Sequence, residues 1–176
     1  MDGAKFKLRV FFDPRCNNLV RSVVISTVKT TFFNIEVKSE DLELNLKHAY
    51  STIRGQYDGE RILAFLMKRS PDEFFFGVLP DDLYVRGLNF VFGVAYPGRG
   101  AVMSLYRLTW HADENLFQER IEKTVKHELG HVFGLSHCAN ICVMRFANSL
   151  YELDIKSKEF CPECKARLRE IGLFHK

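Results

Sequence analysis

Three of the six histidines in this 176-residue chain fall between Lys126 and Met144. His127 and His131 are four residues apart, so on a helix both imidazoles would project from the same side. Glu128 would lie about 100° further round the helix axis and could stand beside a metal ion without binding it. Two imidazoles and one carboxylate in this arrangement indicate a zinc ion with a general base next to it.

A catalytic zinc ion needs a third protein ligand and one open position. Gly134 follows His131 by three residues and can adopt a positive φ, which would end the helix and turn the chain sharply. That turn would bring His137 back toward the metal. The sequence therefore predicts a catalytic zinc site with His127, His131 and His137 as ligands and Glu128 as the catalytic base.

Four of the five cysteines form two close pairs behind these histidines, namely Cys138, Cys142, Cys161 and Cys164. Four thiolates make a complete tetrahedral shell, which is typical of a structural zinc site. We therefore expect two zinc ions per chain, one catalytic and one structural. The alternatives are a set of reduced buried cysteines, or a redox pair at positions 161 and 164. Cys16 has no cysteine close to it in the sequence and is expected to be an unligated thiol.

The composition indicates one soluble globular domain spanning residues 1–176. Apolar residues make up 47% of the chain and charged residues 27%, which is ordinary for such a protein. The net charge of +3 is too weak to indicate nucleic-acid binding. No apolar run approaches the length of a membrane span, and the N-terminus lacks a cleavage site typical of a signal peptide. Close cysteine pairs without an export signal favour metal binding over disulfides, so we expect a cytoplasmic protein. We also expect it to be a monomer.

The hydrophobic pattern predicts strands and helices that alternate along most of the chain. A helix beginning near Asp113, with that residue as its N-cap, would carry the histidine motif. The turn from Pro97 to Gly100 suits a hairpin. Strands are expected at residues 5–12, 33–39, 73–79, 88–96 and 101–110, and helices at 19–32, 58–68 and 162–171. The pattern therefore predicts an α+β or α/β fold with a mixed sheet.

The segment from His127 to Cys138, with the later run Cys142-Val143-Met144 and the pair Cys161 and Cys164, resembles the archaemetzincins, a branch of the metzincin zinc metallopeptidases. Residues 87–108 are similar to the sheet-edge region of that family. The resemblance implies a metzincin-type domain with a twisted mixed sheet, a backing helix and an active-site helix. Its upper part would span about 1–134, and a zinc-stabilised lower part about 135–176.

One feature departs from what the resemblance implies, and a second differs from other branches of the metzincins. Three residues separate Cys138 from Cys142, where four are expected. Phe146 stands two residues after Met144, where some other metzincins carry a tyrosine.

This chemistry predicts a peptidase in which Glu128 accepts a proton from the attacking water and passes it to the leaving amine. By resemblance, a peptide or protein substrate would lie antiparallel to an edge strand within Asn89–Tyr96. One alternative is a metal-dependent ribonuclease, because one such family has a similar histidine spacing with glycine in place of the glutamate. Arg120, Lys123 and Lys126 are interpreted as the solvated face of a helix. The other alternative is a zinc-stabilised binding module without catalysis.

Overall fold

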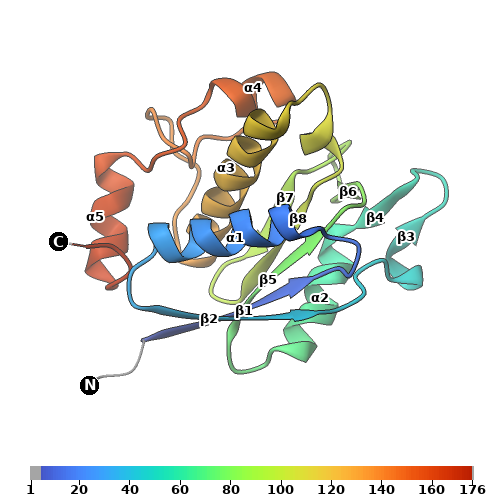
Figure 1. The fold of residues 1–176 in the computed structure, drawn as a ribbon, viewed down its shortest axis with the longest axis horizontal. Coiled ribbons are helices and arrows are strands. Elements are labelled where there is room, and N and C mark those ends of the chain that lie inside the picture. Colours follow the sequence, from blue (N-terminus) through green and yellow to red (C-terminus); the bar gives the residue numbers. More distant parts are fainter. Residues whose placement is uncertain (1–4, 176) are drawn as a thin grey trace.

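The computed structural model describes residues 5–175 and is built on a five-stranded mixed sheet (Figure 1). Four of its strands are parallel, and the fifth, β7, pairs antiparallel to β8 at one edge. The spatial order is β2-β1-β5-β8-β7. The predicted mixed sheet is therefore confirmed. The strands are β1 (Phe6–Phe12), β2 (Ile35–Asp41), β5 (Phe74–Leu79), β7 (Gly93–Tyr96) and β8 (Gly100–Ser104).

Helices cover both faces of this sheet (Figure 1). α1 (Asn18–Thr31) and α3 (Glu114–Val132) pack on one face, and α2 (Gly59–Arg69) packs on the other. Because side chains alternate along a strand, Val10 and Phe12 of β1 lie in the core under α1 and α3, whereas Phe11 lies in the core under α2. Val10, Phe11 and Phe12 are all buried, so the sheet is enclosed on both sides.

A second, smaller sheet holds the segment of residues 85–92 that precedes β7. It consists of β3 (Tyr50–Ser51), β4 (Gln56–Asp58) and β6 (Leu83–Tyr84), and 3-10 turns lie at Lys47–Ala49 and Arg107–Thr109. Arg54, in the turn between β3 and β4, donates hydrogen bonds to the carbonyls of Leu88 and Asn89. Gln56 also donates to the Asn89 carbonyl.

Two predicted strands are longer than the observed ones, and hydrogen bonds between side chains and backbone account for both differences. The predicted strand at 88–96 begins only at Gly93, because the carbonyls of Leu88 and Asn89 bond to side chains of the small sheet. The predicted strand at 101–110 ends at Ser104, whose hydroxyl accepts a hydrogen bond from the Tyr106 amide before the 3-10 turn.

The C-terminal part contains two helices, α4 (Leu150–Ile155) and α5 (Pro162–Glu170). α5 agrees with the helix predicted at 162–171, whereas α4 was not predicted. Cys161 precedes α5, and Pro162 occupies its first position, where a missing N–H costs nothing. No helix among residues 5–175 is long and apolar enough to cross a membrane.

The interpretation of Arg120, Lys123 and Lys126 as a solvated face is wrong, because these side chains are only 3%, 1% and 5% exposed. Arg120 makes two 2.8 Å hydrogen bonds to the Asp154 carboxylate. Lys123 donates to the carbonyls of Leu153 and Asp154, in the last turn of α4, where helix carbonyls lack partners within the helix. The buried cations of α3 therefore hold the C-terminal segment against this helix.

Replacing Lys123 by methionine should lower the free energy of unfolding by about 2–3 kcal/mol, because one buried and one part-buried carbonyl would lose their donor. Urea unfolding followed by circular dichroism measures this change. Lys68→Met is the control, because Lys68 is exposed on α2. A Lys123→Met protein as stable as the control would show that the carbonyls find other partners.

Candidate active site

α3 begins and ends where the sequence predicts. The Asp113 side chain accepts a hydrogen bond from the Leu116 amide at the N-terminus. At the other end Gly134 has φ +95°, a conformation that glycine adopts without strain. Every residue from Lys123 to Gly130 is buried. The half of α3 that carries the motif is therefore largely shielded from solvent.

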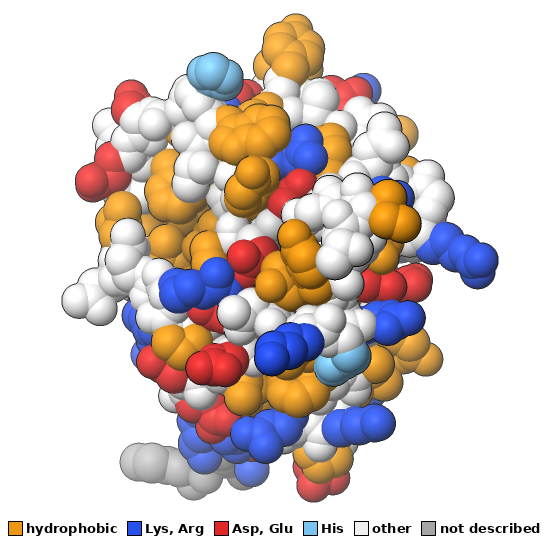
Figure 2. Space-filling model, turned by 90° about the vertical axis from the view of Figure 1, so that its right-hand side faces the viewer, with side chains coloured by type: hydrophobic (Ala, Val, Ile, Leu, Met, Phe, Trp, Pro, Cys, Tyr) orange, Lys and Arg blue, Asp and Glu red, His pale blue; other side chains and the backbone are white. Residues whose placement is uncertain are grey.

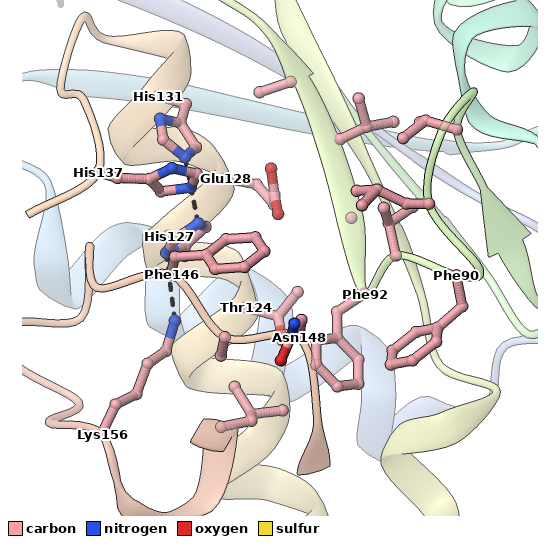
Figure 3. A pocket seen from close by; sticks show the side chains of 18 of the residues that line it. Phe90, Phe92, Thr124, His127, Glu128, His131, His137, Phe146, Asn148 and Lys156 are labelled. Carbon is pink, nitrogen blue, oxygen red and sulfur yellow. Dashed lines mark hydrogen bonds between the residues drawn. The ribbon is translucent and has the colours of Figure 1, made fainter. Parts of the chain in front are cut away.

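The turn at Gly134 brings the third histidine back beside the first two (Figure 3). One ring nitrogen from each of His127, His131 and His137 lies within 4.8 Å of the others. The Nε2 atoms of His127 and His131 are 3.1 Å apart. Two nitrogens bound to one tetrahedral zinc ion are about 3.3 Å apart, given Zn–N distances of 2.0–2.1 Å. The spacing therefore fits a shared zinc ion.

Hydrogen bonds to backbone carbonyls fix the orientation and the tautomer of two of these rings. His127 Nδ1 lies 2.9 Å from the Val143 carbonyl, and His131 Nδ1 lies 2.8 Å from the Leu135 carbonyl. Because a carbonyl can only accept, each Nδ1 carries the proton and each Nε2 is left free to bind metal. Burial lowers the pKa of all three imidazoles, so they are neutral, which is the form that binds metal.

The Glu128 carboxylate projects from α3 into the space between that helix and the wall carrying Phe90 and Phe92 (Figure 3). Burial raises the pKa of Glu128 to about 8, and the positive charge of Lys156 opposes this rise. A carboxylate in such surroundings has a much higher proton affinity than an exposed one, which suits proton transfer near neutral pH.

The four C-terminal cysteines form a second cluster. Their sulfur atoms all lie within 4.8 Å of one another, and Cys138 Sγ is 3.8 Å from Cys161 Sγ. Sulfurs bound to one tetrahedral zinc ion are also about 3.8 Å apart, given Zn–S distances near 2.3 Å. The three-residue spacing between Cys138 and Cys142 is therefore compatible with a four-cysteine zinc site.

Comparison with known proteins identifies the family. Peptidase family M54 matches residues 23–170. The chain belongs to this family. Archaemetzincin of Nanoarchaeum equitans is 42% identical over 142 residues, which cover 81% of this chain and 79% of that protein. The family places the chain among the zinc metallopeptidases, so the archaemetzincin resemblance seen in the sequence is confirmed.

Solved archaemetzincin structures share the fold of this M54 chain. The crystal structure from Methanopyrus kandleri has a TM-score of 0.86 at 39% identity, covering 96% of both chains. The structure from Archaeoglobus fulgidus, a complex with malonate, has a TM-score of 0.83 at 39% identity. It covers 92% of this chain and 99% of that one. The predicted metzincin-type fold is therefore confirmed.

A cavity of about 470 Å³ adjoins the histidine cluster of this M54 peptidase. One wall carries the three histidines and Glu128, and the opposite wall is formed by residues 87–95. Phe146 takes part in the lining, and its ring packs edge-on against His137 with the centroids 5.1 Å apart. The position that is tyrosine in some metzincins therefore contributes only an apolar surface here.

Several residues of the cavity were not predicted from the sequence. Lys156 directly follows α4 and lines the cavity. Its Nζ atom lies 3.2 Å from His127 Nδ1 and donates a hydrogen bond to the Arg145 carbonyl. No motif spacing marks such a lysine, because only the packing of α4 brings it to the site. The same holds for Asn148 and Leu153, whereas Thr124 lies on α3 one turn before His127 and Glu128, where helix periodicity is a signal that could have found it.

Met144 lies beneath the histidines and is fully buried. A Cβ atom added to Gly130 would lie 2.3 Å from Met144 Sδ, far closer than atoms can pack. Gly130 is therefore needed within α3 so that the methionine can contact the helix between His127 and His131.

Replacing Gly130 by alanine should lower the free energy of unfolding by about 1–3 kcal/mol through this overlap, although alanine favours a helix by about 1 kcal/mol. Removing the methionine side chain as well should relieve the overlap. We expect the double variant Gly130→Ala/Met144→Ala to be more stable than the sum of the single changes by at least about 1 kcal/mol, as measured by urea unfolding. A Gly130→Ala protein more stable than the wild type would contradict the close contact.

Proposed function

We propose that the chain hydrolyses peptide bonds at a zinc site formed by His127, His131 and His137, with Glu128 as the catalytic base. The observation that carries this proposal is the convergence of three imidazoles, each with one ring nitrogen within 4.8 Å of the others, beside a carboxylate that lines a cavity. When bound, zinc supplies Lewis acidity, which polarises the substrate carbonyl and lowers the pKa of water toward about 7.

The chain itself supplies orientation and proton transfer. The carbonyls of Val143 and Leu135 hold the two helical imidazoles in the tautomer that leaves Nε2 free. Glu128 accepts the proton of the attacking water at its carboxylate and delivers it to the leaving amine. A substrate that fills the largely apolar cavity would displace water from the site, which would strengthen these electrostatic interactions.

The free edge of β7 supports binding of an extended peptide. The Phe92 carbonyl accepts a 2.8 Å hydrogen bond from the Ser104 amide of β8. In an antiparallel pair such residues alternate with residues whose backbone groups point away from the partner strand. Gly93 and Ala95 therefore present their N–H and C=O groups to the open edge, where a substrate strand can pair. The apolar cavity beside this edge favours substrates with a bulky apolar residue near the scissile bond.

A ribonuclease is less well supported, because the basic side chains that it would need are used inside the protein. Arg120 and Lys123 are buried in bonds to the C-terminal segment. Among the described residues that line the cavity, Lys156 is the only lysine or arginine. On the face shown in Figure 2, Lys and Arg side chains are interspersed with Asp and Glu and form no continuous basic stripe.

We further propose that the four cysteines hold a structural zinc ion, so that the chain contains two metals. No disulfide forms among residues 5–175. A thiolate site of this kind requires a reducing compartment, which supports the expected cytoplasmic location. The zinc would join the loop of residues 138–144 to the start of α5, and its binding free energy would add to folding stability.

Replacing Glu128 by glutamine should lower kcat for peptide hydrolysis by about 10²–10⁴-fold, because an amide of the same shape cannot accept the proton. The zinc content should stay unchanged. Cleavage of a quenched fluorescent peptide library and elemental analysis measure both quantities. Glu114→Gln is the control, since Glu114 is exposed in the first turn of the same helix. Full peptidase activity in Glu128→Gln would overturn the proposal, and RNA cleavage that survives this change would favour the nuclease.

The purified protein should contain two zinc ions per chain, and Cys161→Ser/Cys164→Ser should lose one of them. In thiol labelling at pH 8, the cysteines of residues 138–164 should react only after chelation. Cys16 is an internal control, because its thiol is buried and burial raises its pKa to about 11. It therefore stays protonated at pH 8 and should react only on unfolding. Four reactive thiols in the untreated folded protein would contradict the structural zinc.

A further inference from the structure

Gly93, the first residue of β7, directly faces the Glu128 carboxylate. A Cβ atom built at Gly93 would lie 2.7 Å from Glu128 Cγ, 2.8 Å from Cδ and 2.8 Å from Oε1. These three Glu128 atoms are the nearest neighbours of that position. The carboxylate of the proposed base therefore occupies the space that any side chain at position 93 would need.

The backbone gives no other reason for a glycine at this position. Gly93 is not among the glycines with positive φ, so its torsion angles are open to any amino acid. It lies in a regular antiparallel pair with β8, opposite Met103. Glycine in a strand weakens the strand, and it often marks a place where another group approaches the backbone closely. Here that group is Glu128.

Gly93 is also where the catalytic carboxylate and the binding edge meet. Its N–H and C=O groups point to the open edge of β7, as the bond between Phe92 and Ser104 indicates. A peptide pairing with this edge would therefore run past the point at which the Glu128 carboxylate touches the strand. Contact with the strand fixes the carboxylate relative to the substrate as well as to the histidines.

We propose that the absence of a side chain at Gly93 holds the Glu128 carboxylate in the position from which it transfers protons, so that Gly93 is a positioning residue. This inference rests on the proposed role of Glu128 as the catalytic base. The backbone at Gly93 limits how closely the carboxylate can approach β7. A methyl group on residue 93 would displace the carboxylate from that position. Because the carboxylate ends a flexible side chain, it can move aside while the fold is preserved.

The test is the variant Gly93→Ala in the zinc-loaded full-length chain. A displacement of about 1 Å in a reacting group can cost about a hundredfold in rate, so we expect kcat to fall by about that factor. Zinc content and melting temperature should stay close to those of the wild type. The control Gly59→Ala presses on β7 from the other face of the sheet, because its Cβ would lie 2.8 Å from Val94 Cγ1. Gly59 lies outside the cavity, and we expect kcat within about twofold of the wild type for this control.

A double-mutant cycle separates positioning of the base from a direct effect on the substrate. In a Glu128→Ala background there is no carboxylate to displace, so adding Gly93→Ala should change the residual kcat by less than about twofold. A further hundredfold loss in that background would overturn the proposal, because the methyl group would then be acting on the substrate. An equal loss of kcat in Gly59→Ala would also overturn it, because a general shift of β7 would be enough to explain the effect.

A crystal structure of Gly93→Ala provides a readout that does not depend on activity. We expect the Glu128 carboxylate to be rotated away from β7 while the strand stays in place. A Glu128 side chain that has not moved, with β7 shifted instead, would overturn the inference. If the wild type cleaves no peptide, the proposed function fails, but this structure still decides whether position 93 controls the position of Glu128.

Discussion

The hydrogen bond from His127 Nδ1 to the Val143 carbonyl links the two halves of the site. Val143 lies between Cys142 of the sulfur cluster and Met144 beneath the helix. The Val143 amide donates to the Glu159 carbonyl, so both backbone polar groups of this residue are hydrogen-bonded. The orientation of a proposed catalytic ligand on α3 therefore depends on the folding of the C-terminal segment. A zinc ion in the cysteine cluster would stabilise the same loop, so the second metal would support the first through this carbonyl.

The enclosure of α3 has opposite effects on the groups that it carries. Burial lowers the pKa of His127 and raises the pKa of Glu128, because in both cases it penalises the charged form. The histidine is thereby kept neutral for metal binding, and the carboxylate gains proton affinity. The same helix buries Arg120 and Lys123, whose side chains bond to a carboxylate and to helix carbonyls of the C-terminal segment. Burial therefore shifts the pKa values of the site residues in the C-terminal half of α3. Near the middle of the same helix, buried cations bind the C-terminal segment of the chain.

The sequence predicts those parts of the structure that local geometry determines. The spacing of His127 and His131, the cap at Asp113 and the turn at Gly134 follow from the helix itself, and the hairpin follows from the turn at Pro97–Gly100. The small sheet and the packing of α4 on α3 could not be predicted in this way, although the Ser149 cap at the start of α4 is a local signal. Their positions depend on bonds between distant residues, such as Arg54 to the Leu88 carbonyl, which leave no periodic pattern. The burial of Arg120 and Lys123 leaves no local pattern either, since their partners come from the C-terminal segment.

Two glycines determine how closely the surrounding elements approach the catalytic segment of α3. Because Gly130 has no side chain, the Met144 sulfur can pack against the surface of α3. In the same way, Gly93 allows the Glu128 carboxylate to pack against β7. At each position a methyl group would overlap a neighbouring atom, so the distance between the elements is set by direct contact of backbone with side chain. Sites built on packed helices and strands hold their groups more accurately than sites built on loops. In this protein the carboxylate of Glu128, the proposed base, packs against an edge strand, and that edge is also the surface on which we propose that an extended substrate pairs. The distance between the carboxylate and a peptide bound in this way would therefore be set within one element, so the proposed function needs only a short edge strand for both binding and catalysis.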